Sequence, residues 1–205
     1  MRERICACFR NAPRRALRSD HDLDRTAPPP AAATGLRPAA VLVPIVLHPE
    51  PTVLLTRRDD RLPEHPGQIS FPGGSVEPGD RDPVDTALRE AAEEIALARE
   101  AIEIVGHLDP YVTVTGYRID PVVGLVRPPL TLVPDPAEVA AILEVPLDFV
   151  LNPRNRQVAS GVRHGVRRQF YAIPYKDHYI WGATAHMLVN LAEVLGAAGE
   201  RELAR

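Results

Sequence analysis

A short segment of the chain combines two adjacent glycines with a cluster of acidic residues. Phe71 to Leu97 reads FPGGSVEPGDRDPVDTALREAAEEIAL, which predicts a glycine turn, an acidic loop and a helix. Glu90, Glu93 and Glu94 stand at positions i, i+3 and i+4 of that helix, so their carboxylates are expected to leave from one face. Clustered oxygen ligands favour Mg²⁺ or Mn²⁺, and Mg²⁺ commonly adds substrate phosphates to its ligands. The segment therefore predicts a metal-dependent enzyme that acts on a phosphorylated compound.

The glycine pair and one arginine support this interpretation. Gly73 and Gly74 have no Cβ atom, so the backbone can approach a ligand or a metal closely. Like charges at these helical spacings cost roughly 0.2–0.5 kcal/mol per pair, and only Arg89 is placed to offset them, through Glu93. A bound cation would turn that cost into affinity. The alternative is an acidic surface that contacts a protein and binds no metal.

The helix that carries the glutamates has clear boundaries in the sequence. Asp82 can cap its first turn, Pro83 suits the first helical position, and we expect the helix to end near Leu97. Its apolar positions form one stripe that is expected to face the core: Val84, Leu88, Ala91, Ala92 and Ile95. The glutamates are then expected on the opposite side, where core packing leaves them free.

Composition restricts the class of protein. The 205 residues are 45% hydrophobic, with a formal charge of −3 and a pI near 6.2. This length predicts one domain, and the charge argues against a nucleic-acid partner. No apolar run approaches the roughly 20 residues of a membrane helix, so we expect a soluble, cytoplasmic protein with no membrane partner. A transit peptide in the Arg-rich N-terminus is the alternative. Cys6 and Cys8 are too few for a structural zinc site and are expected to be incidental thiols.

The chain divides into an arm and a domain. Residues 1–36 are Arg-rich and then Pro/Ala-rich, which predicts a short helix followed by a linker. The domain is expected to span 37–205. It opens with two apolar runs around a Pro-flanked turn, which predict a hairpin, and continues through a polar loop into the short strand QISF.

The remainder of the domain predicts a mixture of strands and helices. In chain order these are strands from AIEIVGHL and YRIDPVVGLVR, a helix from PAEVAAILEV, a hairpin turning near His164 and Gly165, and a last helix over about 183–197. Because strands and helices do not alternate regularly, we expect an α/β sandwich around a mixed sheet.

The acidic segment resembles the signature of the Nudix hydrolases, in which G-x5-E-x7-R-E-x-x-E-E-x-G spans a loop, a helix and a loop. Gly74 matches the first glycine, Arg89 and Glu90 match the Arg-Glu pair, and Glu93 and Glu94 match the paired glutamates. The resemblance implies the Nudix α/β/α sandwich and a divalent metal cofactor.

Three departures from the signature are present. Asp80 stands in the place of the early glutamate, and one extra residue separates it from Arg89. Both features resemble the variant found in the coenzyme A pyrophosphatase branch of the family. Ala96 replaces the late glycine, which leaves open how the helix ends, since glycine often closes a helix there.

The residues before the acidic segment resemble the same branch. That branch carries L-L-T-x-R-[SA]-x3-R-x3-G-x3-F-P-G-G, and Leu54 to Gly74 reads LLTRRDDRLPEHPGQISFPGG. Asp59 replaces the small residue and Pro63 replaces the second arginine. If that arginine holds a phosphate of coenzyme A, its loss weakens affinity or shifts the preferred substrate, unless Arg57 or Arg61 takes its place.

The resemblance implies hydrolysis of the pyrophosphate bond of coenzyme A or its thioesters with Mg²⁺ or Mn²⁺, giving 3',5'-ADP and 4'-phosphopantetheine. One alternative is another nucleoside diphosphate conjugate, such as ADP-ribose or a dinucleotide. Another is a Nudix module that senses a nucleotide without catalysis. In each case the partner is a small-molecule nucleotide, and the oligomeric state stays open, a homodimer included.

The resemblance also implies roles for individual residues. The metal ligands are expected to be Glu90 and Glu94 with Glu93 and the backbone of Gly74. Arg89 would orient these carboxylates. The general base is expected either from the signature, where Glu93 is a catalytic candidate, or from a later loop, where Glu138 is the candidate and Glu144 its alternative neighbour. The substrate is expected to contact Arg58, Gly67 and Gly73.

Aromatic and histidine side chains are expected to be structural. Packing is the expected role of Tyr111, Tyr117, Phe170 and Trp181, with adenine stacking by one of them as the alternative. Loop or core positions, rather than roles as bases or ligands, are expected for His65, His107 and His178.

Overall fold

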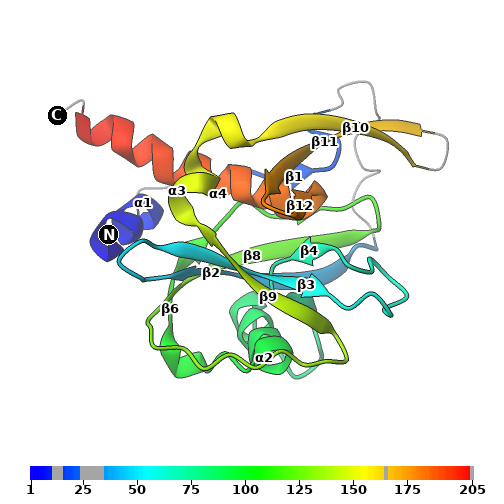
Figure 1. Cartoon of the computed structure of the whole chain (residues 1–205), viewed down its shortest axis with the longest axis horizontal. Coiled ribbons are helices and arrows are strands. Elements are labelled where there is room, and N and C mark those ends of the chain that lie inside the picture. Colours follow the sequence, from blue (N-terminus) through cyan, green and yellow to red (C-terminus); the bar gives the residue numbers. More distant parts are fainter. Residues whose placement is uncertain (11–15, 24–34, 164–165, 204–205) are drawn as a thin grey trace.

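The computed structural model describes residues 1–10, 16–23, 35–163 and 166–203, which form two sheets flanked by helices (Figure 1). Nine described strands form one mixed sheet: β1 (Arg18–Ser19), β2 (Arg37–Val46), β3 (Thr52–Arg58), β4 (Ile69–Ser70), β5 (Gly73–Ser75), β6 (Ile102–His107), β7 (Tyr111–Val112), β8 (Tyr117–Val126) and β9 (Val139–Pro146). A second, antiparallel sheet contains β10 (Gln157–Arg163), β11 (Val166–Tyr175) and β12 (His178–Trp181). The helices are α1 (Arg2–Arg10), α2 (Pro83–Ile95), α3 (Leu147–Leu151) and α4 (Gly182–Leu203), with 3-10 turns at Arg99–Ala101 and Pro153–Asn155.

Strand β2 lies at the centre of the mixed sheet. It runs parallel to β8 along its whole length and pairs at its end with β3 in the antiparallel sense. Near its start it pairs with β5, where Ala40 lies opposite Gly74 and Val41 lies opposite Gly73. The two glycines of the acidic segment are therefore fixed beside the central strand.

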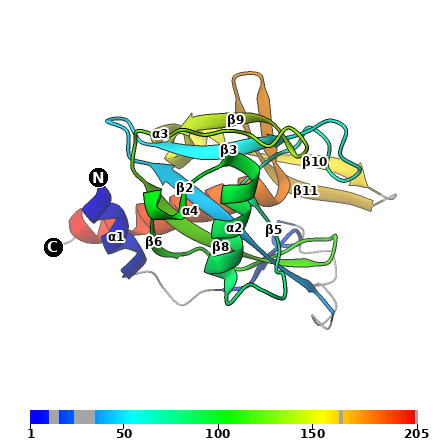
Figure 2. The same cartoon turned by 90° about the horizontal axis from the view of Figure 1, so that it is seen from below.

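Helices cover both faces of the mixed sheet. Successive side chains of a strand point to opposite faces. Leu42 of β2 accordingly belongs to the buried cluster of α2, whereas Val43 belongs to the cluster that contains Leu188 and Leu191 of α4. Figure 2 shows α2 over β2 and β8, with α4 behind the sheet. The predicted α/β sandwich around a mixed sheet is confirmed.

Most of the predicted elements are confirmed. β2 and β3 form the first hairpin, β4 follows the polar loop, and β6 and β8 occupy the predicted strands. Pairing of Arg163 with Val166 confirms the β10–β11 hairpin, whose turn lies outside the described residues. The last helix is α4, which continues to Leu203. No helix in the described part of the chain is both long and apolar enough to cross a membrane.

One predicted element is wrong. The segment PAEVAAILEV, predicted to be a helix, forms a turn followed by strand β9. β9 pairs with β3 along nearly the whole of both strands and buries Val139 and Val145. Alanine, glutamate and leucine favour a helix by only tenths of a kcal/mol per residue. Pairing with an open edge of the sheet outweighs that local preference.

Helix α2 begins as predicted but buries a different set of residues. Asp82 is the N-cap and accepts a hydrogen bond from the Asp85 backbone N–H at 2.9 Å. Ala92 is exposed, and Ala87 is buried instead. Glu94 is also buried, because it stands three residues after Ala91 and seven after Ala87 and so shares their face. The prediction that all the glutamates lie opposite the core is therefore wrong for Glu94.

The end of α2 holds an alanine in a conformation that favours glycine. Ala96 has φ 53° and ψ 30°, and the next backbone N–H, of Leu97, bonds to the Ala91 carbonyl at 3.2 Å. The left-handed conformation costs an L-residue roughly 1–2 kcal/mol. Ala96→Gly is expected to stabilise the protein by about 1 kcal/mol and raise its melting temperature by roughly 2–4 °C.

Thermal unfolding checks this expectation, with Ala98→Gly as the matched control. Ala98 has φ −65° and ψ 134°, which suits an ordinary residue, so glycine there only adds freedom to the unfolded chain. The control is expected to lower the melting temperature. Equal shifts of the melting temperature, with the same sign in both variants, would show that the left-handed conformation of Ala96 is not strained.

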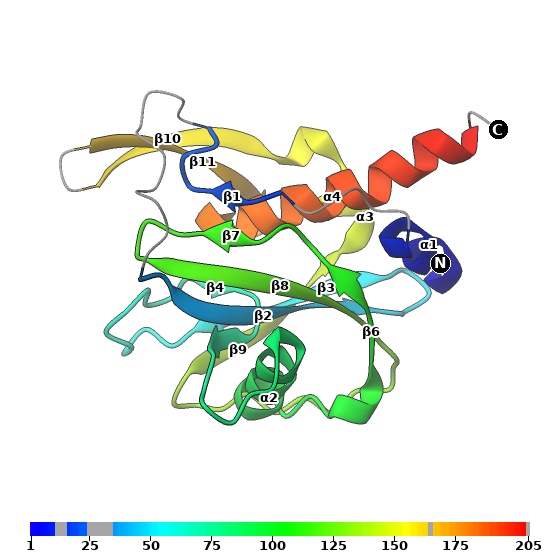
Figure 3. The ribbon, with the colours of Figure 1, turned by 180° about the vertical axis from the view of Figure 1, so that it is seen from behind.

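The described parts of the N-terminal arm pack against the domain. The predicted short helix is α1, which lies beside α4 and β6 and buries Ile5, Cys6 and Cys8. Both cysteines are thiols outside any disulfide of the described residues, and the Cys8 thiol donates to the Leu195 carbonyl at 3.9 Å. β1 pairs in parallel with β7, with Arg18 opposite Tyr111 (Figure 3).

Candidate active site

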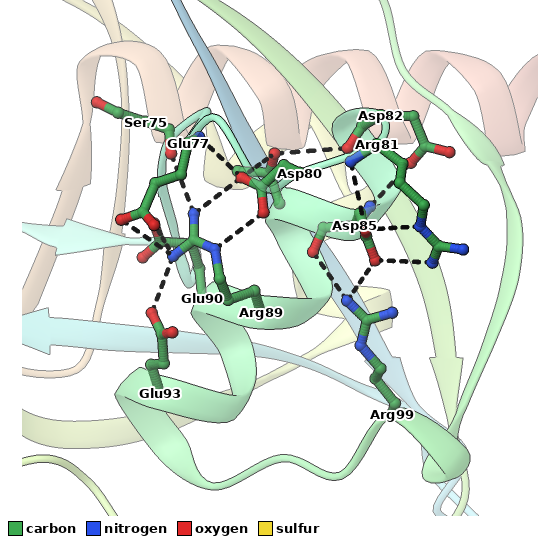
Figure 4. A network of polar contacts seen from close by, with 11 residues as sticks. Ser75, Glu77, Asp80, Arg81, Asp82, Asp85, Arg89, Glu90, Glu93 and Arg99 are labelled. Atoms are coloured by element: carbon green, nitrogen blue, oxygen red, sulfur yellow. Dashed lines mark hydrogen bonds and ion pairs between the residues drawn. The ribbon is translucent and has the colours of Figure 1, made fainter.

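Arg89 organises the loop between β5 and α2. Its Nε and Nη2 donate to the two carboxylate oxygens of Asp80 at 3.0 and 3.1 Å, and Nη2 also donates to the Ser75 carbonyl at 3.1 Å (Figure 4). Asp80 accepts two more hydrogen bonds, from the Glu77 backbone N–H and the Thr86 hydroxyl, each at 2.9 Å. The Arg89 guanidinium holds the pKa of Asp80 well below its ordinary range. Asp80 therefore anchors Arg89 in the place of the signature glutamate.

The same arginine connects two of the helix glutamates. Its Nη1 lies 3.0 Å from Glu90 Oε1 and 2.9 Å from Glu93 Oε2. The predicted ion pair between Arg89 and Glu93 is thus confirmed. The two carboxylates differ in surroundings, since the Glu93 side chain is 60% exposed and the Glu90 side chain is 14% exposed.

Glu94 is buried between α2 and β5. It is 5% exposed, and the Gly73 backbone N–H donates to its Oε1 at 3.4 Å. Burial raises the pKa of Glu94 to about 8, because the charged carboxylate loses its hydration. The negative charges of Glu90 and Glu138 add to this effect. Burial likewise raises the pKa of Glu90, with smaller contributions from Glu93 and Glu138. Glu90, Glu94 and Glu138 therefore form an acidic cluster.

The acidic cluster has the chemistry of a site for a hard divalent cation. No three His, Cys, Asp or Glu side chains of the described residues already surround one point as metal ligands. Even so, the cluster offers only carboxylate oxygens, the donors that Mg²⁺ and Mn²⁺ prefer. The charge of Glu138 raises the pKa of both Glu90 and Glu94, and a cation would neutralise this repulsion. The residues present therefore fit such an ion.

The glycine pair makes room for the cluster. A Cβ atom on Gly73 would lie 2.5 Å from the Ala40 carbonyl oxygen and 2.6 Å from Val41 Cα, so the backbone of β2 excludes any side chain there. A Cβ atom on Gly74 would lie 2.4 Å from Glu90 Oε1. Gly73 is thus required by the sheet, whereas Gly74 leaves space for a carboxylate.

A cavity of about 470 Å³ opens beside the acidic cluster. Five residues predicted for the site line it together: Arg58, Gly73, Gly74, Glu90 and Glu138. The other predicted residues do not line it. Arg89 pairs with Glu90 and Glu93, and the Gly73 backbone N–H donates to Glu94, so these three residues are connected to the lining. Gly67 lines a neighbouring cavity of about 420 Å³. The alternative base, Glu144, lies elsewhere and accepts a hydrogen bond from Thr52.

The two arginines considered as replacements at Pro63 are held by other partners. Arg61 donates to Asp59 at 2.7 Å and to the Pro136 carbonyl at 2.7 Å. Arg57 donates to both carboxylate oxygens of Asp60, at 2.7 and 2.6 Å, and lines only the smaller cavity. Of Arg57, Arg58 and Arg61, Arg58 is thus the one that lines the cavity of the acidic cluster.

Sequence reasoning missed cavity residues that tertiary packing brings in. Asp20 of the arm lines the larger cavity, where it accepts hydrogen bonds from the Tyr111 hydroxyl at 2.6 Å and the Val114 backbone N–H at 2.7 Å. Gln68 and Trp181 line both cavities. Asp20 and Gln68 carry no motif of their own, so only the pairing of β1 with β7 and the position of β4 reveal them.

The expectations for the histidines are met in part. His107 lies in strand β6, as expected of a structural residue. His65 lines both cavities, and His178 lines the smaller one.

Sequence comparisons define the class of protein. A family model described as the NUDIX domain matches residues 36–163. The chain is 42% identical over 166 residues to a protein of Photorhabdus laumondii named uncharacterized Nudix hydrolase NudL, covering 81% of this chain and 89% of that one. It is 41% identical over 157 residues to the NudL protein of Yersinia pestis, covering 77% and 79%. The chain therefore belongs to the Nudix family.

A solved structure agrees at the level of fold. The MutT protein from Methanosarcina mazei Go1 superposes with a TM-score of 0.50 at 14% identity, covering 84% of this chain and 99% of that one. This likeness shows the Nudix fold alone. Family membership adds the chemistry: the protein is a Nudix hydrolase, with the pyrophosphohydrolase activity general to a family that uses divalent ions such as Mg²⁺ or Mn²⁺.

Proposed function

We propose that this Nudix hydrolase cleaves the pyrophosphate bond of coenzyme A or its thioesters, giving 3',5'-ADP and 4'-phosphopantetheine. The observation that carries the proposal is the segment from Leu54 to Gly74, which resembles the coenzyme A branch in register. Its Arg58 and Gly73 line the cavity beside the acidic cluster. The segment that suggests the substrate thus lines the same cavity as the carboxylates suited to catalysis.

The acidic cluster supplies the groups for the reaction. Glu90 and Glu94, with the backbone at Gly74, would hold the divalent cation, and Arg89 keeps Glu90 and the exposed Glu93 in place. A bound cation neutralises phosphate oxygens and lowers the pKa of water. Glu138 faces the same cavity and is the proposed general base. It would take a proton as the water oxygen bonds to phosphorus and the bridging P–O bond breaks.

A substrate panel tests this proposal. Coenzyme A, acetyl coenzyme A, ADP-ribose and a diadenosine polyphosphate are each incubated with Mg²⁺ or Mn²⁺, and the products are identified by mass. We expect coenzyme A compounds to give a kcat/KM at least about tenfold above the others, a difference of roughly 1.4 kcal/mol. A higher kcat/KM for ADP-ribose or for the dinucleotide would identify that compound, and not coenzyme A, as the preferred substrate. Nucleotide binding without turnover would instead indicate a sensing module.

Calorimetry tests whether the acidic cluster binds metal at all. Titration of Mg²⁺ or Mn²⁺ at millimolar concentration is expected to show saturable binding. No binding would favour the alternative of an acidic surface for a protein partner.

The role of Glu138 predicts a loss of activity. Glu138→Gln is expected to lower kcat about 100-fold, because the variant cannot accept the proton of water. Glu144→Gln makes the same chemical change six residues later, in strand β9, at a residue paired with His48 and Thr52 outside the cavity. Steady-state kinetics of the two variants check the assignment, and equal activities would contradict it.

A substitution at Gly74 is expected to change the position of the Glu90 carboxylate. Gly74→Ala would push the flexible Glu90 carboxylate aside, so we expect a folded protein whose kcat/KM falls about 100-fold. Gly79→Ala is the control, since a Cβ atom there meets no atom within 4 Å. Kinetics and thermal unfolding of both variants are the measurement. Full activity of Gly74→Ala would show that the position of Glu90 is unimportant.

A further inference from the structure

Trp181 forms the boundary between the two cavities. It ends β12, directly before α4, and lines both the cavity of the acidic cluster and the smaller one beside it. The residue is 36% exposed, and the Phe170 ring packs against it with centroids 5.3 Å apart. The Phe170 ring thus supports the indole, while part of the indole surface borders the cavities. It lies beyond residues 36–163, the part matched by the family model.

The other aromatic residues considered for stacking are less available. Tyr111 is 2% exposed, and its hydroxyl is bonded to Asp20. Phe170 lines neither cavity. Tyr117 lines the larger cavity, but the Arg37 guanidinium lies over its ring at 3.9 Å from the centroid. Among these four residues, only Trp181 borders both cavities.

We propose that Trp181 is the base-stacking residue of this enzyme and that its ligand is the adenine end of a nucleotide. A compound whose phosphates lie at Gly73, Gly74 and Glu90 shares one cavity with Trp181, so its base can reach the indole. Aromatic rings bind bases by stacking on them. This inference rests on the proposed function for the orientation of the substrate, and it adds the residue that recognises the nucleoside.

Gln68 supplies a polar group beside the indole. It lines both cavities, as Trp181 does, and a Cβ atom built on Gly182 would lie 4.0 Å from its side-chain nitrogen. A glutamine amide has a donor and an acceptor, the pair that adenine presents at N7 and N6 in complementary form. Stacking on Trp181 holds the ring, and Gln68 selects adenine over guanine.

The chain contains one tryptophan, so its fluorescence reports on Trp181 alone. The full-length protein is titrated with AMP in the presence of EDTA, and ribose 5-phosphate serves as the matched ligand without a base. AMP is expected to change the fluorescence saturably, while ribose 5-phosphate leaves it unchanged. GMP is expected to bind more weakly than AMP, and Gln68→Leu to remove that preference. Equal responses to AMP and ribose 5-phosphate would overturn the proposal.

Calorimetry extends the test to variants without the indole. Trp181→Leu is expected to weaken AMP binding about 10- to 100-fold, whereas Trp181→Phe keeps a stacking surface and most of the affinity. Tyr117→Leu is the control and is expected to change the affinity less than about threefold, within the usual spread for a residue that carries little binding energy. Thermal unfolding verifies that each variant is folded. Unchanged AMP affinity in Trp181→Leu, or an equal loss in Tyr117→Leu, would refute the assignment.

Activity assays separate this inference from the proposed function. If the parent binds AMP through Trp181 but does not hydrolyse coenzyme A, the substrate proposal fails and the stacking assignment stands. If it hydrolyses coenzyme A and Trp181→Leu leaves KM unchanged, the stacking assignment fails and the substrate proposal stands.

Discussion

Glu94→Gln is expected to lower kcat about 10³- to 10⁴-fold while leaving the protein folded. Glutamine has nearly the shape of glutamate but no charge, so the acidic cluster would lose a strong ligand for the divalent cation. Metal ions stabilise transition-state charge by several kcal/mol, and each 1.36 kcal/mol is tenfold in rate. Steady-state kinetics with Mg²⁺ or Mn²⁺ and coenzyme A measure the effect. If the variant is folded and as fast as the parent, the proposed metal site is wrong.

The same substitution is expected to stabilise the metal-free protein at alkaline pH. Burial raises the folded-state pKa of Glu94 to about 8, above the roughly 4.3 of an unfolded chain. Between these values the unfolded state has already released a proton that the folded state keeps. The stability contribution of Glu94 is therefore fully present below pH 4 and is lost as pH rises through 8.

Denaturant unfolding in EDTA measures this pH dependence. Near pH 8.5 the variant is expected to exceed the parent in free energy of unfolding by on the order of 2–4 kcal/mol, and the difference should shrink toward pH 4. Glu100→Gln, the same change at an exposed residue, is the control and should show no such trend. A pH-independent difference would show that burial of the Glu94 charge is not its cause.

Arg89→Lys is expected to disrupt the loop that precedes helix α2. A lysine ammonium cannot reproduce the fork that holds both Asp80 oxygens, the Ser75 carbonyl and two glutamates at once. We expect the melting temperature to fall by roughly 5–10 °C, because lysine keeps the charge but cannot donate to both Asp80 oxygens and the Ser75 carbonyl at once, which leaves acceptors of the loop unpaired. We also expect kcat/KM to fall about 100-fold, because Glu90 is no longer held in place.

Thermal unfolding and kinetics check the Arg89 prediction, and Arg81→Lys is the matched control. Arg81 pairs with Asp85, but its side chain is 78% exposed, so the pair contributes little. The pKa of Asp80 is depressed, so its contribution is present above the unfolded-state pKa near 3.9 and is lost as pH falls below it. The difference between parent and Arg89→Lys should therefore narrow in acid. A difference that stays constant to pH 2.5 would contradict the role of Asp80.

Local signals in the sequence were sufficient for α2 and the loop before it. Asp82 caps the helix, Pro83 starts it, and Arg89 reaches Glu93 one turn away, because each of these interactions spans only a few residues. Local signals did not determine which alanines of α2 belong to its buried face. Ala87 and Ala92 both suit a helix, and contact with the sheet decides which is buried.

Long-range strand pairing explains why the segment that was predicted to be a helix forms a strand. In PAEVAAILEV the helical preference is local and weak, whereas the paired residues of β3 lie 81 to 94 positions earlier in the chain and supply hydrogen-bonding partners along the whole strand. The same pairing brings the turn with Glu138 to the acidic cluster, where its charge acts on Glu90 and Glu94.

The sequence by itself determined the family, the acidic helix and the identity of its glutamates, because spacing along one helix and one motif carries that information. Only the tertiary structure decided that Glu94 is buried against Gly73 and that Glu93 is exposed. It also decided that Asp20 and Trp181, from opposite ends of the chain, line the cavity of the acidic cluster. The physical reason is that burial and proximity across a sheet depend on strand pairing, which the pattern within one short segment does not contain.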